Sequence, residues 1–263
     1  MSFPGPPAPS RLRRVVDPLL QAVVDLIYPR LCCVCKVPLD DGRPGWFCKV
    51  CADELPLMEP PYCKVCGEFY DGAFTNEFRC MNCDGRRLEF EFAVAACRAE
   101  GVVREMIHQF KYERRLQLRA PLATLLSRTL QDPRLADENL AAWALVPVPL
   151  HRSRELDREF NQSWELCVRL SGLTGIPAIQ ALSRMRETDS QASLDRDERL
   201  KNLRGAFALR KTRPWEEKVT LQGRRILLVD DVFTTGATTS ECARVLRREG
   251  GAEKVVVITV ARG

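Results

Sequence analysis

The residues from Ile226 to Thr239 restrict the fold of this chain more than any other stretch. Four apolar residues run without alternation into Asp230 and Asp231, a pattern typical of a parallel strand that is buried on both faces and ends at the rim of its sheet. Small and hydroxylated residues follow, and then a helical pattern over Cys242 to Arg247 that a pair of glycines ends. The stretch therefore predicts a strand, an acidic pair, a loop and a helix, in that order.

The loop after the acidic pair has the composition of an anion site. It contains Thr234, Thr235, Gly236, Ala237 and Thr238. Free backbone N–H groups and the helix N-terminus would supply donors and partial positive charge, and the threonine hydroxyls would add further donors. The two carboxylates accept hydrogen bonds, so beside a phosphate they suit the paired hydroxyls of a ribose or a divalent metal held against phosphate.

Other kinds of site begin in a similar way. A P-loop needs a lysine before its Ser or Thr, and a dinucleotide-binding loop needs a spaced glycine triplet; this loop has neither. A receiver domain also begins with a hydrophobic strand and an acidic pair, but it needs a phosphoacceptor aspartate and a lysine on later strands. Only one more strand, Lys254 to Val260, is expected after the helix. These three alternatives are therefore disfavoured.

The cysteines indicate a second module. Eight of the twelve form four C-x-x-C pairs: Cys32 and Cys35, Cys48 and Cys51, Cys63 and Cys66, and Cys80 and Cys83. The regular spacing predicts two zinc ribbons, each with four thiolates on one tetrahedral Zn²⁺. Ligation by consecutive pairs is favoured, although crossed pairing fits the same pattern, and Cys33 could replace Cys32. A disulfide cluster would require an oxidising compartment, which nothing else in the sequence indicates.

We expect three segments. Residues 1–29 are expected to hold a disordered, proline-rich tail and a short amphipathic helix, residues 30–87 a double zinc ribbon, and residues 88–263 an α/β domain. In the last segment, strands are expected at 90–97, 144–148, 177–182, 206–209, 226–229 and 254–260, and helices at 102–110, 121–130, 160–170 and 242–247. This alternation predicts a parallel sheet flanked by helices, with its site at the carboxyl ends of the strands.

Charge and hydropathy limit the partners and the location that we expect for this protein. The net charge is only +5, with 40 basic residues interspersed among 35 acidic ones, so phosphorylated ligands or nucleic acid are allowed but not required. No apolar run approaches the length of a membrane span, which excludes an integral membrane protein. The apolar stretch from Val15 to Ile27 is interrupted by polar residues and lacks a cleavage site, so we expect a cytoplasmic protein without a secretion signal.

A second candidate for the rim follows the strand at 144–148. It consists of Leu150, His151, Arg152, Ser153 and Arg154. Basic side chains directly after a buried strand would face the same crevice as the acidic pair, where they could hold a pyrophosphate.

Two resemblances bear on these motifs. The hydrophobic strand, the acidic pair and Thr-Thr-Gly-x-Thr together resemble the phosphoribosyl-pyrophosphate signature of type I phosphoribosyltransferases. The wider pattern resembles the ComF family, the competence protein F type of phosphoribosyltransferase-like protein that often carries a double zinc ribbon. Its motifs lie at residues 107–112, 146–154, 160–162, 184–194, 198–199 and 202–207. One departure is Glu159, where the family usually has glycine before Phe-Asn-Gln.

The resemblance implies a type I phosphoribosyltransferase-like sheet that binds phosphoribosyl pyrophosphate with Mg²⁺. By resemblance, Asp230 and Asp231 contact the ribose hydroxyls and the loop from Thr234 to Thr238 holds the 5′-phosphate. The segment from Leu150 to Arg154 corresponds to the pyrophosphate loop.

The polar run between residues 184 and 204 resembles the mobile loop that closes over the ligand. Within it, Arg186 and Arg204 are candidates to act in catalysis together with the acidic pair. Glycosyl transfer develops positive charge at the sugar and negative charge on a Mg²⁺-bound pyrophosphate, so catalysis rests on positioning, water exclusion and charge stabilisation.

Two classes of function remain. The first is an enzyme that transfers phosphoribosyl to an acceptor; no candidate base-recognition hood follows the last expected strand, so the acceptor pocket is expected to involve the zinc module, the early helices or a partner. The second is a non-catalytic module whose nucleotide-sugar site is regulatory and whose zinc ribbons contact single-stranded DNA or a protein such as a DNA-uptake helicase. The family's link to DNA uptake in natural transformation supports the second class. The basic residues near the cysteine pairs are Lys49, Lys64, Arg79, Arg86 and Arg87.

Overall fold

The computed structural model describes residues 30–39, 45–70, 80–136, 138–186, 203–211 and 220–263. The chain divides into two compact units, residues 1–55 and 56–263. The predicted tail and helix of residues 1–29 lie outside the described residues. None of the described helices is long and apolar enough to cross a membrane.

The first unit contains two tight cysteine turns. Cys32 N donates to Val37 O at 2.8 Å, and an antiparallel bridge joins Leu31 to Pro38. The second turn leads into helix α2 (Lys49–Asp53), whose N-cap is Cys48. The cysteine pairs thus lie in backbone turns that are too short to bury a core of their own.

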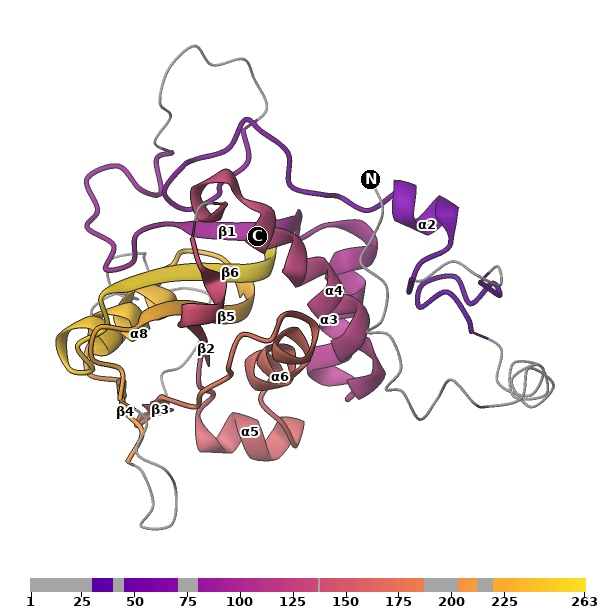
Figure 1. Cartoon of the computed structure of the whole chain (residues 1–263). Coiled ribbons are helices and arrows are strands. Elements are labelled where there is room, and N and C mark those ends of the chain that lie inside the picture. Colours follow the sequence, from indigo (N-terminus) through magenta and orange to yellow (C-terminus); the bar gives the residue numbers. More distant parts are fainter. Residues whose placement is uncertain (1–29, 40–44, 71–79, 137, 187–202, 212–219) are drawn as a thin grey trace. The chain divides into compact units, whose positions relative to one another are not determined.

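The second unit is built on a four-stranded parallel sheet in the order β1, β6, β5, β2 (Figure 1). A separate antiparallel pair consists of β3 and β4. The strands are β1 (Ala93–Arg98), β2 (Trp143–Pro147), β3 (Leu182–Arg184), β4 (Phe207–Leu209), β5 (Arg225–Phe233) and β6 (Lys254–Arg262). The predicted parallel α/β sheet is confirmed.

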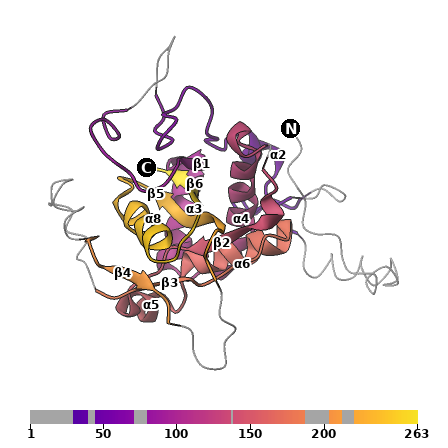
Figure 2. The same cartoon turned by 60° about the vertical axis from the view of Figure 1, so that its left-hand side comes forward.

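Helices cover both faces of this sheet. The α-helices are α3 (Gly101–Tyr112), α4 (Arg119–Ser127), α5 (Arg152–Arg158), α6 (Gln162–Thr174) and α8 (Ala237–Arg248), and short 3-10 helices lie at Leu116–Leu118, Arg128–Gln131, Pro133–Leu135 and Leu140–Ala142. Figures 1 and 2 show α8 on one side of the sheet and α3, α4 and α6 on the other. This layering leaves the carboxyl ends of the strands for a site.

The sequence pattern explains why these elements form. The apolar positions of α3 recur at helical spacing, and Val103, Met106, Ile107 and Phe110 are all buried, as the pattern predicts. In β6, every residue after Lys254 is buried, as expected for a strand covered on both faces.

The second set of cysteines belongs to the same core as the sheet. Cys63, Cys66, Cys80 and Cys83 are buried in a cluster with Phe90 and with residues of β5, β6 and α8. The backbone continues this contact, since Ala93 N of β1 donates to Val65 O at 2.8 Å. The compact unit therefore includes the second cysteine set, whereas the boundary at residue 88 stays a prediction.

Several segments differ from the expected elements. The strand β5 continues to Phe233, and α8 begins at Ala237 rather than at Cys242. The strand expected at 177–182 forms a single parallel bridge between Ala178 and Leu145, and β3 begins only at Leu182. The second rim segment is a loop only as far as His151, because helix α5 begins at Arg152.

Of the three described non-glycine residues with positive φ, two contact each other. Glu159, which ends α5, has φ 68° and ψ −10°, and Arg114 has φ 54°. The Arg114 guanidinium forms an ion pair with the Glu159 carboxylate and donates to Asp157 O at 3.0 Å. The left-handed turn explains why glycine suits position 159, and the ion pair offsets part of the strain in this chain.

We predict that Glu159→Gly is more stable than Glu159→Ala by about 1 kcal/mol, because both variants lose the exposed ion pair but only glycine relieves the left-handed strain. Urea unfolding of the two variants measures this difference. An alanine variant as stable as the glycine variant would contradict the assigned backbone conformation.

Candidate functional site

The site is built at the carboxyl end of β5, between its two neighbouring strands. Val229 of β5 pairs with Pro147 of β2 and with Ile258 of β6. Beyond the end of β2, Val148 N still donates to Val229 O at 2.9 Å. The acidic pair lies inside β5, directly after the most enclosed part of the sheet, whereas the strand was expected to end at residue 229.

Each carboxylate of the acidic pair has a partner from a different helix. Lys111 Nζ of α3 lies 2.9 Å from Asp231 Oδ1, and both side chains are largely buried. Ser163 Oγ, in the first turn of α6, donates to Asp230 Oδ1 at 3.0 Å, and the backbone N–H of Asp231 donates to the same oxygen at 2.9 Å. Two helices thus fix the orientation of both carboxylates before any ligand is bound.

The environment of Asp230 changes the pKa of its carboxyl group. Burial raises the pKa of the Asp230 carboxyl to about 7, and the charge of Asp231 adds to the rise, while Lys111 opposes it. Burial alone would lower the pKa of Lys111, but the charge of Asp231 outweighs it, so the pKa of Lys111 is raised and the amine stays charged. Asp230 is therefore the group whose charge changes near neutral pH.

Asn161 positions the helix that carries Ser163. Its side-chain oxygen accepts from Ser163 N at 2.9 Å and caps α6, while its Nδ2 donates to Val148 O at 3.1 Å. One side chain thus joins the start of α6 to the chain that leaves β2. This gives a structural reason for asparagine in the Phe-Asn-Gln motif.

The loop after the acidic pair turns at Gly236 and leads into the 12-residue helix α8. Gly236 has φ 74°, and a Cβ atom there would lie 2.6 Å from the ring of Phe233, so only glycine fits. Thr235 Oγ1 accepts from Ala237 N at 3.4 Å, and Thr239 Oγ1 donates to Gly236 O at 3.1 Å. As predicted, a threonine-rich turn opens onto a helix N-terminus.

The second rim segment is organised by His151. The His151 ring caps α5, since Nδ1 lies 3.4 Å from Ser153 N and 2.9 Å from Ser153 Oγ. Arg152 is exposed, whereas Leu150 and Arg154 are partly buried. The role of the segment in holding a pyrophosphate stays a prediction.

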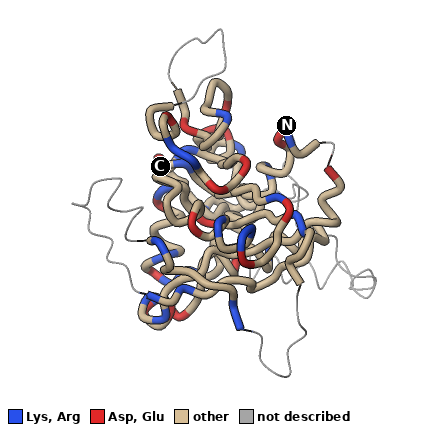
Figure 3. The backbone as a smooth tube through the Cα atoms, turned by 90° about the vertical axis from the view of Figure 1, so that its left-hand side faces the viewer, with Lys and Arg blue, Asp and Glu red and all other residues tan. Residues whose placement is uncertain are grey.

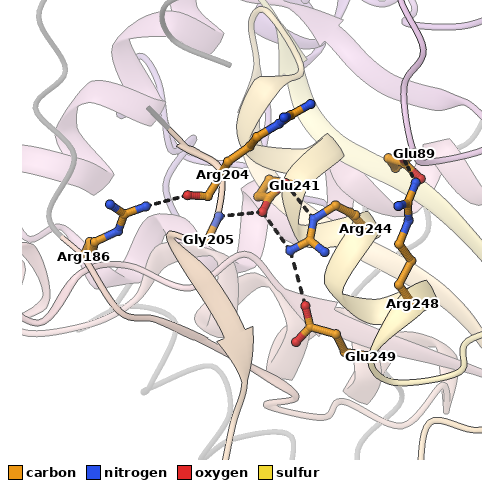
Figure 4. Close-up of polar contacts among 8 residues, drawn as sticks. All are labelled: Glu89, Arg186, Arg204, Gly205, Glu241, Arg244, Arg248 and Glu249. Atoms are coloured by element: carbon orange, nitrogen blue, oxygen red, sulfur yellow. Dashed lines mark hydrogen bonds and ion pairs between the residues drawn. The ribbon is translucent and has the colours of Figure 1, made fainter. Parts of the chain in front are cut away.

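Of the two candidate arginines, Arg186 contacts the backbone of the other, Arg204, rather than the acidic pair. Arg186 Nη2 donates to Arg204 O, and the buried Glu241 of α8 accepts from Gly205 N at 2.9 Å and from Arg244 (Figure 4). Among the described residues, no hydrogen bond or ion pair joins either Arg186 or Arg204 to the acidic pair. Residues 187–202 of the run lie outside the described residues.

Sequence reasoning gave no role to several residues that build the site. Lys111, Asn161 and Ser163 orient the acidic pair, but the first two appeared only as members of a family pattern. The sequence does carry one signal for Lys111, because a lysine next to the apolar face of a helix can reach a buried acid. Glu241 had no comparable signal, because a single acid in a helix usually lies in solvent.

The cysteines form two four-sulfur sets by consecutive pairs. The sets are Cys32, Cys35, Cys48 and Cys51, and Cys63, Cys66, Cys80 and Cys83, with the sulfur atoms of each set within 4.8 Å of one another. Consecutive pairing is confirmed, and Cys33 lies outside the first set. All twelve cysteines are in the described part of the chain, and none forms a disulfide.

The spacing of the sulfur atoms fits zinc. A tetrahedral site with Zn–S bonds of about 2.3 Å places its sulfur atoms about 3.8 Å apart. Cys35 Sγ lies 3.6 Å from Cys48 Sγ, and Cys66 Sγ lies 3.3 Å from Cys80 Sγ. Hydrogen bonds from neighbouring thiols hold the pKa of Cys63 far below its usual range, whereas the pKa values of Cys66 and Cys83 are raised by hydrogen bonds to Cys63. Both sets can therefore hold a structural Zn²⁺.

We predict that the chain binds two zinc ions and that Cys32→Ala leaves one, because the change removes one of four ligands from the first set. Cys33→Ala is the matched control and keeps both ions, since Cys33 is not a ligand. Metal analysis of the purified proteins measures the stoichiometry. A Cys33→Ala protein with one zinc would reassign the ligand.

We also predict that Asp230→Asn stabilises the ligand-free protein at pH 8 but not at pH 4. The folded carboxyl titrates near pH 7 and the unfolded one near 4, so the wild-type protein loses stability as the pH rises between these values. The gain at pH 8 is at most about 4 kcal/mol, the equivalent of three pKa units. Urea unfolding at both pH values measures it, with the exposed Asp157→Asn as control. An equal effect at both pH values would contradict the raised pKa.

Comparison with known proteins agrees with the zinc module. Residues 23–84 match the double zinc ribbon domain family.

Among solved structures, the allosteric regulatory enzyme of purine biosynthesis aligns with 58% of this chain at 19% identity and a TM-score of 0.36. A hypoxanthine phosphoribosyltransferase from Staphylococcus aureus aligns with 52% of it at 9% identity and a TM-score of 0.32. The chain spans 30% and 61% of these two proteins, respectively.

Curated relatives cover most of the chain. DNA utilization protein YhgH of Escherichia coli K12 is 32% identical over 228 residues, which are 86% of this chain and 95% of the relative. Competence protein F of Haemophilus influenzae is 29% identical over 88% of this chain and 96% of the relative. By this likeness over nearly the whole length of its relatives, the chain belongs to the ComF family, that of competence protein F and YhgH.

Proposed function

We propose that this protein binds phosphoribosyl pyrophosphate together with Mg²⁺ at the carboxyl end of β5, and that it transfers the phosphoribosyl group to an acceptor. The observation that carries the proposal is the continuity of two binding features. The acidic pair, held by Lys111 and Ser163, runs directly into the Thr-Gly turn at the N-terminus of α8. One short segment thus offers acceptors for hydroxyls and donors for a phosphate.

Each part of the ligand has a chemically suited partner. The 5′-phosphate would accept hydrogen bonds from backbone N–H groups and hydroxyls of the loop from Thr234 to Thr238. The ribose hydroxyls would donate to Asp230 and Asp231. The pyrophosphate would lie near the segment from Leu150 to Arg154, which follows β2, the strand next to β5. The ligand would therefore span the ends of two adjacent strands.

The carboxylate oxygens of the acidic pair fit a hard divalent cation, which prefers oxygen ligands. Mg²⁺ bound with the pyrophosphate would neutralise part of the negative charge that develops on this leaving group. The residues of the chain orient the sugar: Lys111 and Ser163 fix the carboxylates, and the carboxylates fix the ribose. Because these contacts are formed before binding, little reorganisation is needed during transfer.

The names of the relatives suggest a biological setting. Because they are called competence protein F and DNA utilization protein YhgH, we propose a role in DNA uptake, with single-stranded DNA or an uptake helicase as partner. A non-catalytic module that senses the nucleotide sugar is the second candidate. Of the five basic residues named near the cysteine pairs, Lys49, Lys64 and Arg87 are exposed and Arg86 is partly buried, while Arg79 lies outside the described residues.

The distribution of charge favours contact with nucleic acid over a small part of the surface rather than over a wide face. Lys and Arg are interspersed with Asp and Glu along the described chain (Figure 3). Nucleic-acid binding over a wide surface would instead be favoured by positive charge gathered on one face. The exposed basic residues of the ribbons are the part of the chain that we assign to this partner.

We predict that calorimetry with phosphoribosyl pyrophosphate and Mg²⁺ detects binding that the double variant Asp230→Ala, Asp231→Ala weakens by at least about 100-fold. This corresponds to the loss of two charge-assisted hydrogen bonds of about 1.5 kcal/mol each. Asp157→Asn, which changes an exposed acid of α5, is the control and binds as the wild-type protein does. Absence of binding by the intact protein would refute the proposed site.

Catalysis is tested separately by pyrophosphate release with a panel of nitrogen and hydroxyl acceptors. Release that depends on one acceptor, and that the double variant lacks, supports the enzyme. Ligand binding without release over the whole panel favours the sensing module.

A further inference from the structure

Two arginines connect the second cysteine set to the loop that follows the acidic pair. Both contacts lie within the second compact unit, residues 56–263. Their acceptors are Phe233 O and Thr235 O, the backbone carbonyls on either side of Thr234. The two guanidinium groups thus hold the beginning of the loop from two directions.

Arg86 reaches the loop from the last cysteine turn. Its Nη1 donates to Thr235 O at 3.1 Å and also to the backbone and side-chain oxygens of Asn82 at 3.0 Å and 2.9 Å. Asn82 lies between the ligands Cys80 and Cys83 and is 5% exposed, and Arg86 N donates to Cys83 O at 3.3 Å. The position of Arg86 therefore depends on the shape of the turn that carries two zinc ligands.

Arg262 reaches the loop from the end of β6. Its side chain is 5% exposed, and Nη1 donates to Phe233 O at 3.1 Å. Its Nη2 forms an ion pair with Glu68, which lies two residues after Cys66 and whose backbone oxygen accepts from Cys63 N at 2.8 Å. Arg262 is thus held by Glu68, whose backbone is fixed by the turn of the first two ligands of the same set.

A contribution to folding stability does not explain why these two arginines are buried. Nε and Nη2 of Arg86 and Nε of Arg262 are buried and make no hydrogen bond within the described residues. Burying charged donors without acceptors is unfavourable, and apolar side chains would fill the same space at lower cost. A positioning role toward the loop accounts for their presence, because only a long side chain with several donors can join a cysteine turn to two loop carbonyls.

We propose that Arg86 and Arg262 are positioning residues that couple the zinc state of the Cys63, Cys66, Cys80 and Cys83 set to the anion-binding loop. Zinc in this set fixes both cysteine turns, the turns fix the two guanidinium groups, and these fix the carbonyls beside Thr234. The coupling is reciprocal, so a ligand at the loop also raises the affinity of this set for zinc. The inference rests on the proposed binding of phosphoribosyl pyrophosphate at the loop.

Zinc release from the wild-type protein tests the coupling without any substitution. A chromogenic chelator in excess should release zinc in two phases, a fast one from the first set, in which Cys35 is exposed, and a slow one from the buried second set. We expect phosphoribosyl pyrophosphate with Mg²⁺ to slow only the slow phase, about fivefold or more. A slow phase with an unchanged rate, in a protein that calorimetry shows to bind the ligand, would overturn the inference.

The variants Arg86→Gln and Arg262→Gln test the two connections. Each should weaken ligand binding about tenfold and reduce the effect of the ligand on zinc release. The matched control is Arg134→Gln, because Arg134 donates to Lys64 O of the same cysteine module and packs over Phe92 but does not contact the loop. It should bind as the wild-type protein does.

The outcomes separate the two proposals. Lack of binding by the wild-type protein refutes the proposed function and this inference with it. Normal binding by the wild-type protein and by both folded variants, with two zinc ions in each, refutes this inference alone. If a glutamine variant does not fold, the wild-type zinc-release experiment decides.

Discussion

The site depends on placing two carboxylates next to each other at the end of a buried strand. Asp230 and Asp231 repel each other, and the apolar sheet around them offers little screening. Lys111 supplies the positive charge that makes the arrangement tolerable, and it approaches from α3, far earlier in the chain. Without this lysine, burial and the charge of Asp231 would raise the pKa of Asp230 further, and the rim would lose part of the negative charge that we assign to ribose and metal binding.

The other contacts around the pair follow from the same constraint. The helix α6 brings Ser163 to Asp230, and Asn161 fixes the start of that helix against the end of β2. The helix α8 begins immediately after the turn at Gly236. Three helices therefore meet at one strand end, two to hold the acids and one to present a positive helix end, so opposite charges are arranged within a few residues.

The sequence predicted the parts that depend on local pattern. Unbroken apolar runs indicated β5 and β6, helical spacing indicated the buried face of α3, and regular C-x-x-C spacing indicated the two cysteine sets. It did not predict contacts between distant segments, such as Lys111 with Asp231 or Arg86 with Thr235, because one sequence carries no signal for which polar side chains meet. The helix α5 was missed altogether, because His151 is an unusual N-cap.

Burial of the second cysteine set within the main core links folding of the sheet to metal supply. Four sulfur atoms lie among the apolar side chains of the sheet and α8, where a metal-free set would place several polar groups in an apolar environment. During synthesis these cysteines emerge before β5 and β6, the strands that complete the core around them. A chain that has acquired no zinc would therefore expose an unfinished sheet, and zinc shortage would reduce the amount of this protein through proteolysis before it changed the activity of each molecule.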